Sequence, residues 1–200
     1  DVMKFPGVLV FLRKAEPTGG TEGSVVNHIG FLVRDLDPWV ARWKAAQIKF
    51  VMENMKNRQV FIEAPDGVKI KIYEDKTIAA PIVNHHVHFY TSAVEEIRAW
   101  YVKMFGAKPG KRLRFEAADL PGVNLTFSPS EKPTAATKGR SLDHIRFEID
   151  NLEAFCRKLE GLGVKFDIAY RKVPALGIAV AFLTDPWGTY VELTEGLNKL

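Results

Sequence analysis

The sequence predicts an α+β fold made of repeated units, each with one strand, one helix and three further strands. Short segments around His28, His86 and His144 resemble one another, and the steps from the first histidine to the second and from the second to the third are both 58 residues. A helical pattern follows each segment, and strand-like stretches separated by turn residues follow each helix. Repetition at a constant period indicates units that cannot bury their apolar faces alone and must pair with a neighbour.

Each unit opens with a short strand whose side chains alternate between two faces. In the second unit His86, His88 and Tyr90 share one face, and in the third unit His144 and Arg146 do so. The opposite faces are apolar and are expected to lie under the helices. The polar faces are therefore predicted to line a cleft.

The helices and turns complete each unit. The third helix has the clearest apolar stripe, with residues three and four apart: Leu152, Phe155, Cys156, Leu159 and Leu162. The second helix ends at Gly106, and Pro38 stands near the start of the first. A turn at 185–188, Asp-Pro-Trp-Gly, separates the last two strands of the third unit, and Ala-Pro-Asp-Gly at 64–67 is its counterpart in the first.

Two segments suggest how the units are grouped. Residues 7–12 resemble residues 122–127, so the N-terminus looks like the closing part of an earlier, incomplete unit. The connector 75–83 contains Pro81 and predicts a boundary between an N-terminal domain, residues 1–78, and a C-terminal domain, residues 79–200. The second and third units are expected to pair within the C-terminal domain.

Composition excludes several classes of protein. The net charge of +4 is spread along the chain, whereas a nucleic-acid surface would need a denser basic stripe. No apolar run is long enough to predict a membrane span. Cys156 is the only cysteine, which rules out an internal disulfide or a thiolate zinc cluster. A cytoplasmic location is favoured, although export remains an alternative if an N-terminal segment is removed from the protein.

The closing strand of each unit carries a variable residue at one position. Glu192 lies in Val-Glu-Leu-Thr, Asn124 in Val-Asn-Leu-Thr and Lys71 in Ile-Lys-Ile-Tyr. Alternation along the closing strand of the third unit places Tyr190 on the same face as Glu192. Each unit thus offers a histidine on its first strand and one variable side chain on its last.

This combination resembles the vicinal oxygen chelate superfamily, which includes glyoxalases, bleomycin-resistance proteins, extradiol dioxygenases and epimerases. The resemblance rests on the repeated strand–helix–three-strand units, the leading histidines, and the Asp-Pro-Trp-Gly turn followed by Val-Glu-Leu. It implies tandem βαβββ units that pair into two domains with cupped sheets. It also implies a metal held inside a cup by residues from first and last strands.

The resemblance implies that His86, His144 and Glu192 bind the metal. Two imidazoles and one carboxylate form the facial set associated with non-haem Fe(II) oxygenases, so Fe(II) is favoured, with Zn, Ni or Mn as alternatives. Lys71 would repel a cation, and the N-terminal domain is therefore expected to be metal-free. Asn124 at the fourth position cannot accept a proton at neutral pH, which favours dioxygenase over isomerase chemistry.

Other polar residues of the cleft are candidates for catalysis. His88 can act as an acid or base, and Tyr90, Arg146 and Tyr190 can hold an anionic or enolate-like oxygen of the substrate. His28 is expected to be structural. His85 should point toward the helices, unless the strand register shifts by one residue and exchanges the roles of His85 and His86.

Three functions are compatible with these features. The first is a divalent-metal enzyme, most similar to an extradiol dioxygenase, that acts on a small molecule with two neighbouring oxygens. The second is a non-catalytic protein that sequesters a small ligand, as in the antibiotic-resistance branch of the superfamily, and the third is a glyoxalase-type isomerase. Neither nucleic acid nor membrane is an expected partner, and a homodimer is one way to complete the partial unit at the N-terminus.

Overall fold

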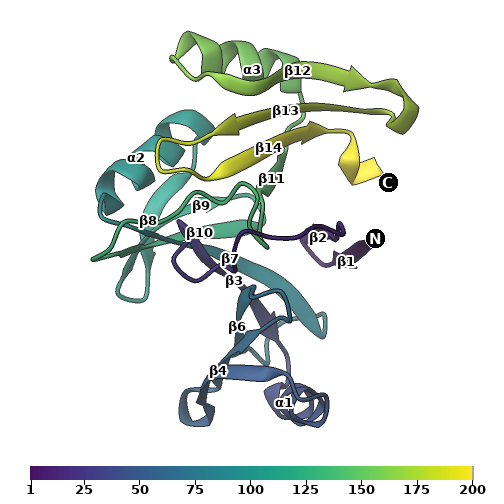
Figure 1. The fold of residues 1–200 in the computed structure, drawn as a ribbon, viewed down its shortest axis with the longest axis vertical. Coiled ribbons are helices and arrows are strands. Elements are labelled where there is room, and N and C mark those ends of the chain that lie inside the picture. Colours follow the sequence, from purple (N-terminus) through teal and green to yellow (C-terminus); the bar gives the residue numbers. More distant parts are fainter. Residues whose placement is uncertain (200) are drawn as a thin grey trace.

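The computed structural model describes residues 1–199 and contains the three complete units together with an N-terminal hairpin (Figure 1). The hairpin consists of β1 (Val2–Phe5) and β2 (Val8–Phe11). The first unit consists of β3 (Val26–Val33), α1 (Leu36–Ala45), β4 (Lys49–Asn54), β5 (Gln59–Glu63) and β6 (Lys69–Glu74). The second consists of β7 (Ile82–Thr91), α2 (Val94–Phe105), β8 (Lys108–Arg112), β9 (Phe115–Leu120) and β10 (Val123–Pro129). The third consists of β11 (Ile145–Glu148), α3 (Leu152–Gly161), β12 (Phe166–Val173), β13 (Ile178–Thr184) and β14 (Tyr190–Glu195).

The first two units share one sheet. Its eight strands run in the order β4-β5-β6-β3-β7-β10-β9-β8, and the leading strands β3 and β7 pair antiparallel at its centre. The third unit forms a separate sheet in the order β11-β14-β13-β12. This differs from the predicted pairing of the second unit with the third, and the connector 75–83 joins two units of the same sheet. Every unit has a similar leading strand, so the repeat alone cannot specify which two leading strands pair.

The second and third units nevertheless share a hydrophobic core through their helical layers. The Phe105 ring of α2 lies 5.3 Å from Phe147 and 5.7 Å from Phe155, measured between ring centroids. The buried Tyr101 hydroxyl donates a hydrogen bond to the Asp185 carboxylate at 3.0 Å. The two units therefore pack against each other on the side away from the polar faces of their sheets.

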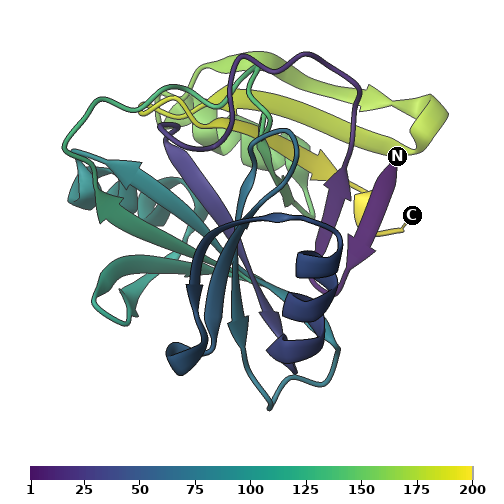
Figure 2. The same ribbon diagram turned by 60° about the horizontal axis from the view of Figure 1, so that its bottom comes forward.

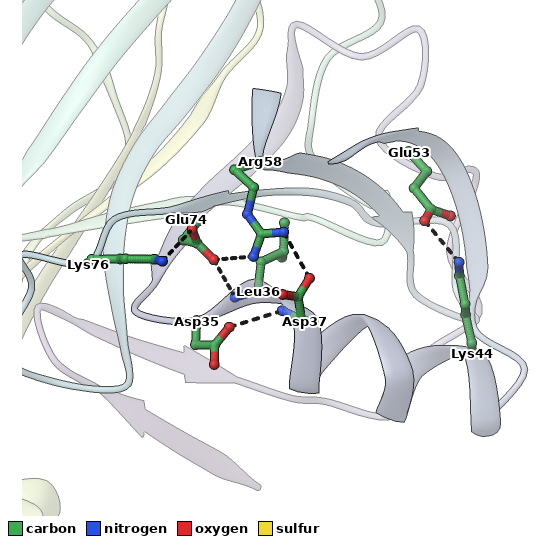
Figure 3. A network of polar contacts seen from close by, with 8 residues as sticks. All are labelled: Asp35, Leu36, Asp37, Lys44, Glu53, Arg58, Glu74 and Lys76. Carbon is green, nitrogen blue, oxygen red and sulfur yellow. Dashed lines mark hydrogen bonds and ion pairs between the residues drawn. The ribbon is translucent and has the colours of Figure 1, made fainter. Parts of the chain in front are cut away.

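Helix α1 is attached to its sheet by a polar network (Figure 3). Asp35 caps the helix by accepting a hydrogen bond from the Asp37 amide, and Glu74 accepts one from the Leu36 amide at 3.0 Å. Arg58 pairs with both Glu74 and Asp37. The hydrogen bond from Arg58 is the main reason that the pKa of Glu74 is lowered to about 2. The network connects the helix start to β6, whose residues contribute to the site.

The N-terminal hairpin contacts all three units (Figures 1 and 2). Phe5 lies against Phe31 at a ring-centroid distance of 5.4 Å, and the Asn84 amide donates to the Pro6 carbonyl at 3.2 Å. The Arg146 guanidinium of the third unit lies 4.1 Å from the centre of the Phe11 ring. No helix among residues 1–199 is both long and apolar enough to cross a membrane.

Candidate functional site

Three histidines from the two central strands of the eight-stranded sheet lie together. One ring nitrogen of His28 on β3 and one each of His86 and His88 on β7 lie within 4.8 Å of one another, and all three residues are buried. These residues come from two different units, so the site exists because β3 and β7 pair. As the alternation of the strand predicts, His86 and His88 are on the same face.

The strand register explains how the three rings fit. His28 is opposite His88, and Gly30 is opposite His86. A Cβ atom on Gly30 would lie only 1.9 Å from Cε1 of His86, so the His86 ring occupies space that only glycine leaves open. Gly30 is therefore a requirement of the histidine cluster, although its own backbone φ is not in the left-handed region.

Two β-bulges orient the rings. The pairing of β3 with β7 skips Asn27 on one strand and His85 on the other, so each is the extra residue of a bulge. Asn27 Oδ1 lies 2.9 Å from Nδ1 of His28, and His85 Nδ1 lies 2.9 Å from Nδ1 of His86. The bulge interrupts strand alternation, and this is why His85 contacts His86 instead of pointing toward the helices as expected.

In the third unit, too, the residue before the histidine contacts its ring. Asp143 Oδ1 lies 2.7 Å from Nδ1 of His144. In every unit the residue before the histidine therefore holds Nδ1 of its ring and leaves Nε2 directed away from it. Metal-binding histidines usually have one ring nitrogen held in this way by a neighbouring group, which fixes the orientation of the other.

His88 provides a test of whether the cluster suits a metal. Its Nε2 is 2.7 Å from the Ser128 hydroxyl, whereas its Nδ1 is buried without a hydrogen-bond partner. Leaving such an atom unsatisfied costs about 1–3 kcal/mol. In the other two rings the second nitrogens, Nε2 of His28 and Nε2 of His86, lie 3.4 Å apart, at the long limit of a hydrogen bond to each other. Each histidine thus has one nitrogen held by a residue outside the cluster and one that is not, and the second is the candidate for binding a metal ion.

Burial keeps these imidazoles neutral. It is the main reason that the pKa values of His28 and His86 lie far below the ordinary range and that the pKa of His88 falls to about 3. The positive charges of Lys71 and Arg112 lower the pKa of His88 further. Neutral imidazole is the form that coordinates metals, and it suits Zn, Cu, Fe and Ni. This set contains no carboxylate, so the argument for Fe(II) from two histidines and an acid does not apply to it.

A cavity of about 360 Å³ lies beside the cluster. It is lined by side chains of β5, β6, β9 and the β8–β9 turn: Gln59, Lys71, Tyr73, Leu113, Arg114 and Phe115. The Tyr73 ring is 6.2 Å from His86, and the Phe115 ring is 5.3 Å from His88, between centroids. A small molecule in this cavity would lie close to the three histidines.

The structure divides the predicted ligands between two sheets. His86 belongs to the cluster, whereas His144 and Glu192 lie in the third unit, with His144 Nε2 2.9 Å from Glu192 Oε2. Arg146 binds the same carboxylate oxygen. Burial alone would raise the pKa of Glu192, but its hydrogen bonds to His144 and Arg146 lower it. Glu192 is thus held by two side chains of its own unit, and the three predicted ligands do not form one cluster.

The four predicted catalytic residues are divided in the same way. His88 and Tyr90 belong to the first sheet, with ring centroids 5.2 Å apart. Arg146 and Tyr190 belong to the second, where Tyr190 lies 6.0 Å from His144. His88 lies within the histidine cluster.

The register also corrects the position assigned to Asn124. Glu192 is opposite Arg146, and the corresponding residue of the second unit is Thr126, opposite His88. Asn124 is two residues away, opposite His86. The sequences of β10 and β14 still look alike when one is shifted by two residues against the other, because apolar and polar residues alternate in both strands. Thr126 also cannot accept a proton at neutral pH, so a carboxylate base is still missing at this position.

His28 was expected to be structural, and the structure places it in the cluster. The equal spacing of the leading histidines was the signal that could have found it, because equivalent positions in paired units meet at the centre of a sheet. Lys71 on the adjacent β6 was the reason for the opposite expectation.

Comparisons with known proteins agree with this fold. A model of the Glyoxalase/Bleomycin resistance protein/Dioxygenase superfamily matches residues 84–193. A glyoxalase I mutant from Zea mays is similar in structure, with a TM-score of 0.64, 18% identity, and coverage of 86% of this chain and 69% of that chain. A candidate dioxygenase from Bacillus subtilis subsp. subtilis str. 168 has a TM-score of 0.65 and 12% identity, covering 90% of this chain and 64% of that chain. At these identities the likeness shows the fold alone, and the chain spans about two thirds of each neighbour. A search of curated proteins found no match.

Proposed function

Because the chain belongs to the Glyoxalase/Bleomycin resistance protein/Dioxygenase superfamily, we propose that it is an enzyme whose divalent metal is held by His28, His86 and His88. Its substrate is a small molecule with neighbouring oxygen atoms that enters the adjacent cavity. The observation that carries this proposal is the cluster itself, with three buried neutral imidazoles that each have one ring nitrogen within 4.8 Å of a ring nitrogen of the other two.

A metal at this position would act as a Lewis acid and polarise an oxygen of the substrate. Three protein ligands leave coordination positions open for that oxygen, as in catalytic zinc sites. Zn, Cu, Ni and Fe are all compatible with an imidazole set, so the proposal commits to the ligands rather than to one metal. The chain's own residues bind and orient the substrate and hold the ligand rings in place through Asn27, His85 and Ser128.

Metal analysis of protein purified without chelator tests this proposal. The wild type is expected to contain one metal per chain, and His86→Ala is expected to lose it. His144→Ala is the matched control, because it removes the equivalent histidine of the third unit, which directly precedes β11, and it is expected to retain the metal. Retention by His86→Ala together with loss by His144→Ala would contradict the proposal and favour a site around Glu192.

One observation favours a second candidate, a non-catalytic ligand-binding protein. Among the described residues, neither the cluster nor the cavity lining includes an Asp or Glu that can take a proton from a substrate. This candidate predicts that a small molecule binds in the cavity equally well before and after treatment with a chelator. A metal enzyme predicts that the chelator removes turnover, whether of a dioxygenase or an isomerase substrate.

A further inference from the structure

We propose that the cavity beside the histidines recognises the oxyanion of a small aromatic carboxylate or phosphate through Lys71, Arg112 and Arg114. The inference rests on the proposed function, since it names the chemical class of ligand for the same site. Three independent features of the chain carry it: cations without counter-charges, a buried guanidinium nitrogen without a partner, and aromatic walls.

The cations around the cavity lack acidic partners. Among residues 1–199, no carboxylate lies within ion-pair distance of Lys71, Arg112 or Arg114, whereas the nearby Lys69 pairs with Glu22. Lys71 is only 8% exposed, and burial lowers its pKa, as expected for a cation without a counter-charge. Burying an uncompensated charge is costly, so an anionic ligand would be stabilised here.

Arg112 has an unused donor next to the cavity lining, since its guanidinium carbon lies 5.9 Å from the centre of the Tyr73 ring. Its Nε donates to the Thr126 hydroxyl at 2.7 Å, and its Nη1 is 3.5 Å from the Tyr73 hydroxyl. Its Nη2 is buried and has no hydrogen-bond partner. A guanidinium is well suited to carboxylate and phosphate oxygens because its donors are planar and can bind two oxygens together. An oxyanion would satisfy this nitrogen and the Lys71 ammonium together.

The walls of the cavity suit an apolar, flat ligand body. Tyr73 and Phe115 line the cavity, and the Lys71 Nζ lies 4.6 Å from the centre of the Tyr73 ring and 4.8 Å from that of Phe61. Arg114 lies 5.2 Å from the centre of the Phe115 ring. Aromatic side chains favour stacked or edge-on contacts with another ring. The anion would therefore be one end of an aromatic molecule rather than a free inorganic ion.

The same charges predict coupling between anion and metal. Lys71 and Arg112 lie 4.6 and 5.9 Å from the centre of the Tyr73 ring, which is itself 6.2 Å from the His86 ring, so both cations are close enough to repel a positive ion held by the histidines. An oxyanion bound to Lys71 and Arg112 would offset this repulsion and strengthen metal binding. Because coupling between two sites is reciprocal, the metal would strengthen anion binding by the same factor.

Calorimetric titration with benzoate, phenyl phosphate and benzamide tests the inference, since benzamide has nearly the shape of benzoate without its charge. Both anions are expected to bind the metal-loaded wild type about tenfold or more tightly than benzamide, a difference of ~1.4 kcal/mol or more. Lys71→Met and Arg114→Gln are expected to reduce this preference. Lys165→Met, which removes an exposed cation just before β12 in the third unit, is the matched control and should leave it unchanged.

Three results would overturn the inference: equal affinity for benzamide and the anions, no binding of either anion, or an unchanged preference in both Lys71→Met and Arg114→Gln. Arg114 is exposed, so its variant keeps the test valid if Lys71→Met does not fold. The ratio of phenyl phosphate to benzoate affinity identifies which oxyanion is preferred. Metal content is measured on the same samples, so a failure of anion recognition with metal present is distinguished from a failure of the metal site.

Discussion

Gly30→Ala should destroy the metal site without changing any metal ligand. The new Cβ would lie 1.9 Å from Cε1, 2.1 Å from Nδ1 and 2.8 Å from Nε2 of the His86 ring. Ordinary contact between such atoms is about 3.5–4.0 Å, so the ring must move by roughly 1.5–2 Å. Metal–ligand distances tolerate changes of only about 0.2 Å. We therefore expect metal affinity to fall by about 100-fold or more, which is the upper range for changes that misplace a ligand.

Competition of each variant with a chromophoric chelator measures this loss. The matched control is Gly110→Ala on β8 of the same sheet, where a Cβ would meet nothing within 4 Å. Overpacking at Gly30 is expected to lower stability by about 1–3 kcal/mol, so circular dichroism should confirm that the variant remains folded under the assay conditions. Wild-type metal affinity in folded Gly30→Ala would refute the account, because His86 could not then occupy the position described.

Two further predictions concern stability. Glu74→Gln should lower the free energy of unfolding at neutral pH by roughly 1 kcal/mol, because it weakens the bonds to Arg58 and the start of α1. The pKa of Glu74 is depressed from 4.5 to about 2, so its contribution is present above pH 4.5 and is lost as the pH falls toward 2. Urea titrations should show the difference between wild type and variant shrinking over that range, and a constant difference would count against the role of the carboxylate charge. Tyr101→Phe should lower the free energy of unfolding by about 1–3 kcal/mol, because it removes a hydrogen-bond donor to the buried Asp185. Urea titration measures this loss as well. An unchanged free energy of unfolding would mean that this hydrogen bond does not stabilise the packing of the second unit on the third.

The sequence was informative about the repeated unit because its signals are local. Alternation along a strand placed His86 and His88 on one face, and apolar spacing and capping located the helices. Both depend only on residues a few positions apart. The period also indicated that units must pair, since a single cupped sheet leaves an apolar face uncovered.

Pairing and register were harder to predict because they depend on contacts between distant residues. The bulges at Asn27 and His85 change which side chains meet, yet neither residue has a sequence signature of a bulge. Polar and apolar residues alternate so regularly in the closing strand of the second unit that a shift of two residues preserves the pattern. For this reason the sequence pointed to Asn124, whereas the register places Thr126 at that position. Lys71 was interpreted only through its charge, without the aromatic rings and the cavity that surround it.

Anomalous diffraction from crystals of the metal-loaded protein, recorded at the absorption edge of the metal, tests the central claim most directly. The account predicts one anomalous peak among Nε2 of His28, Nε2 of His86 and Nδ1 of His88. A peak between His144 and Glu192, with none at the three histidines, would contradict it.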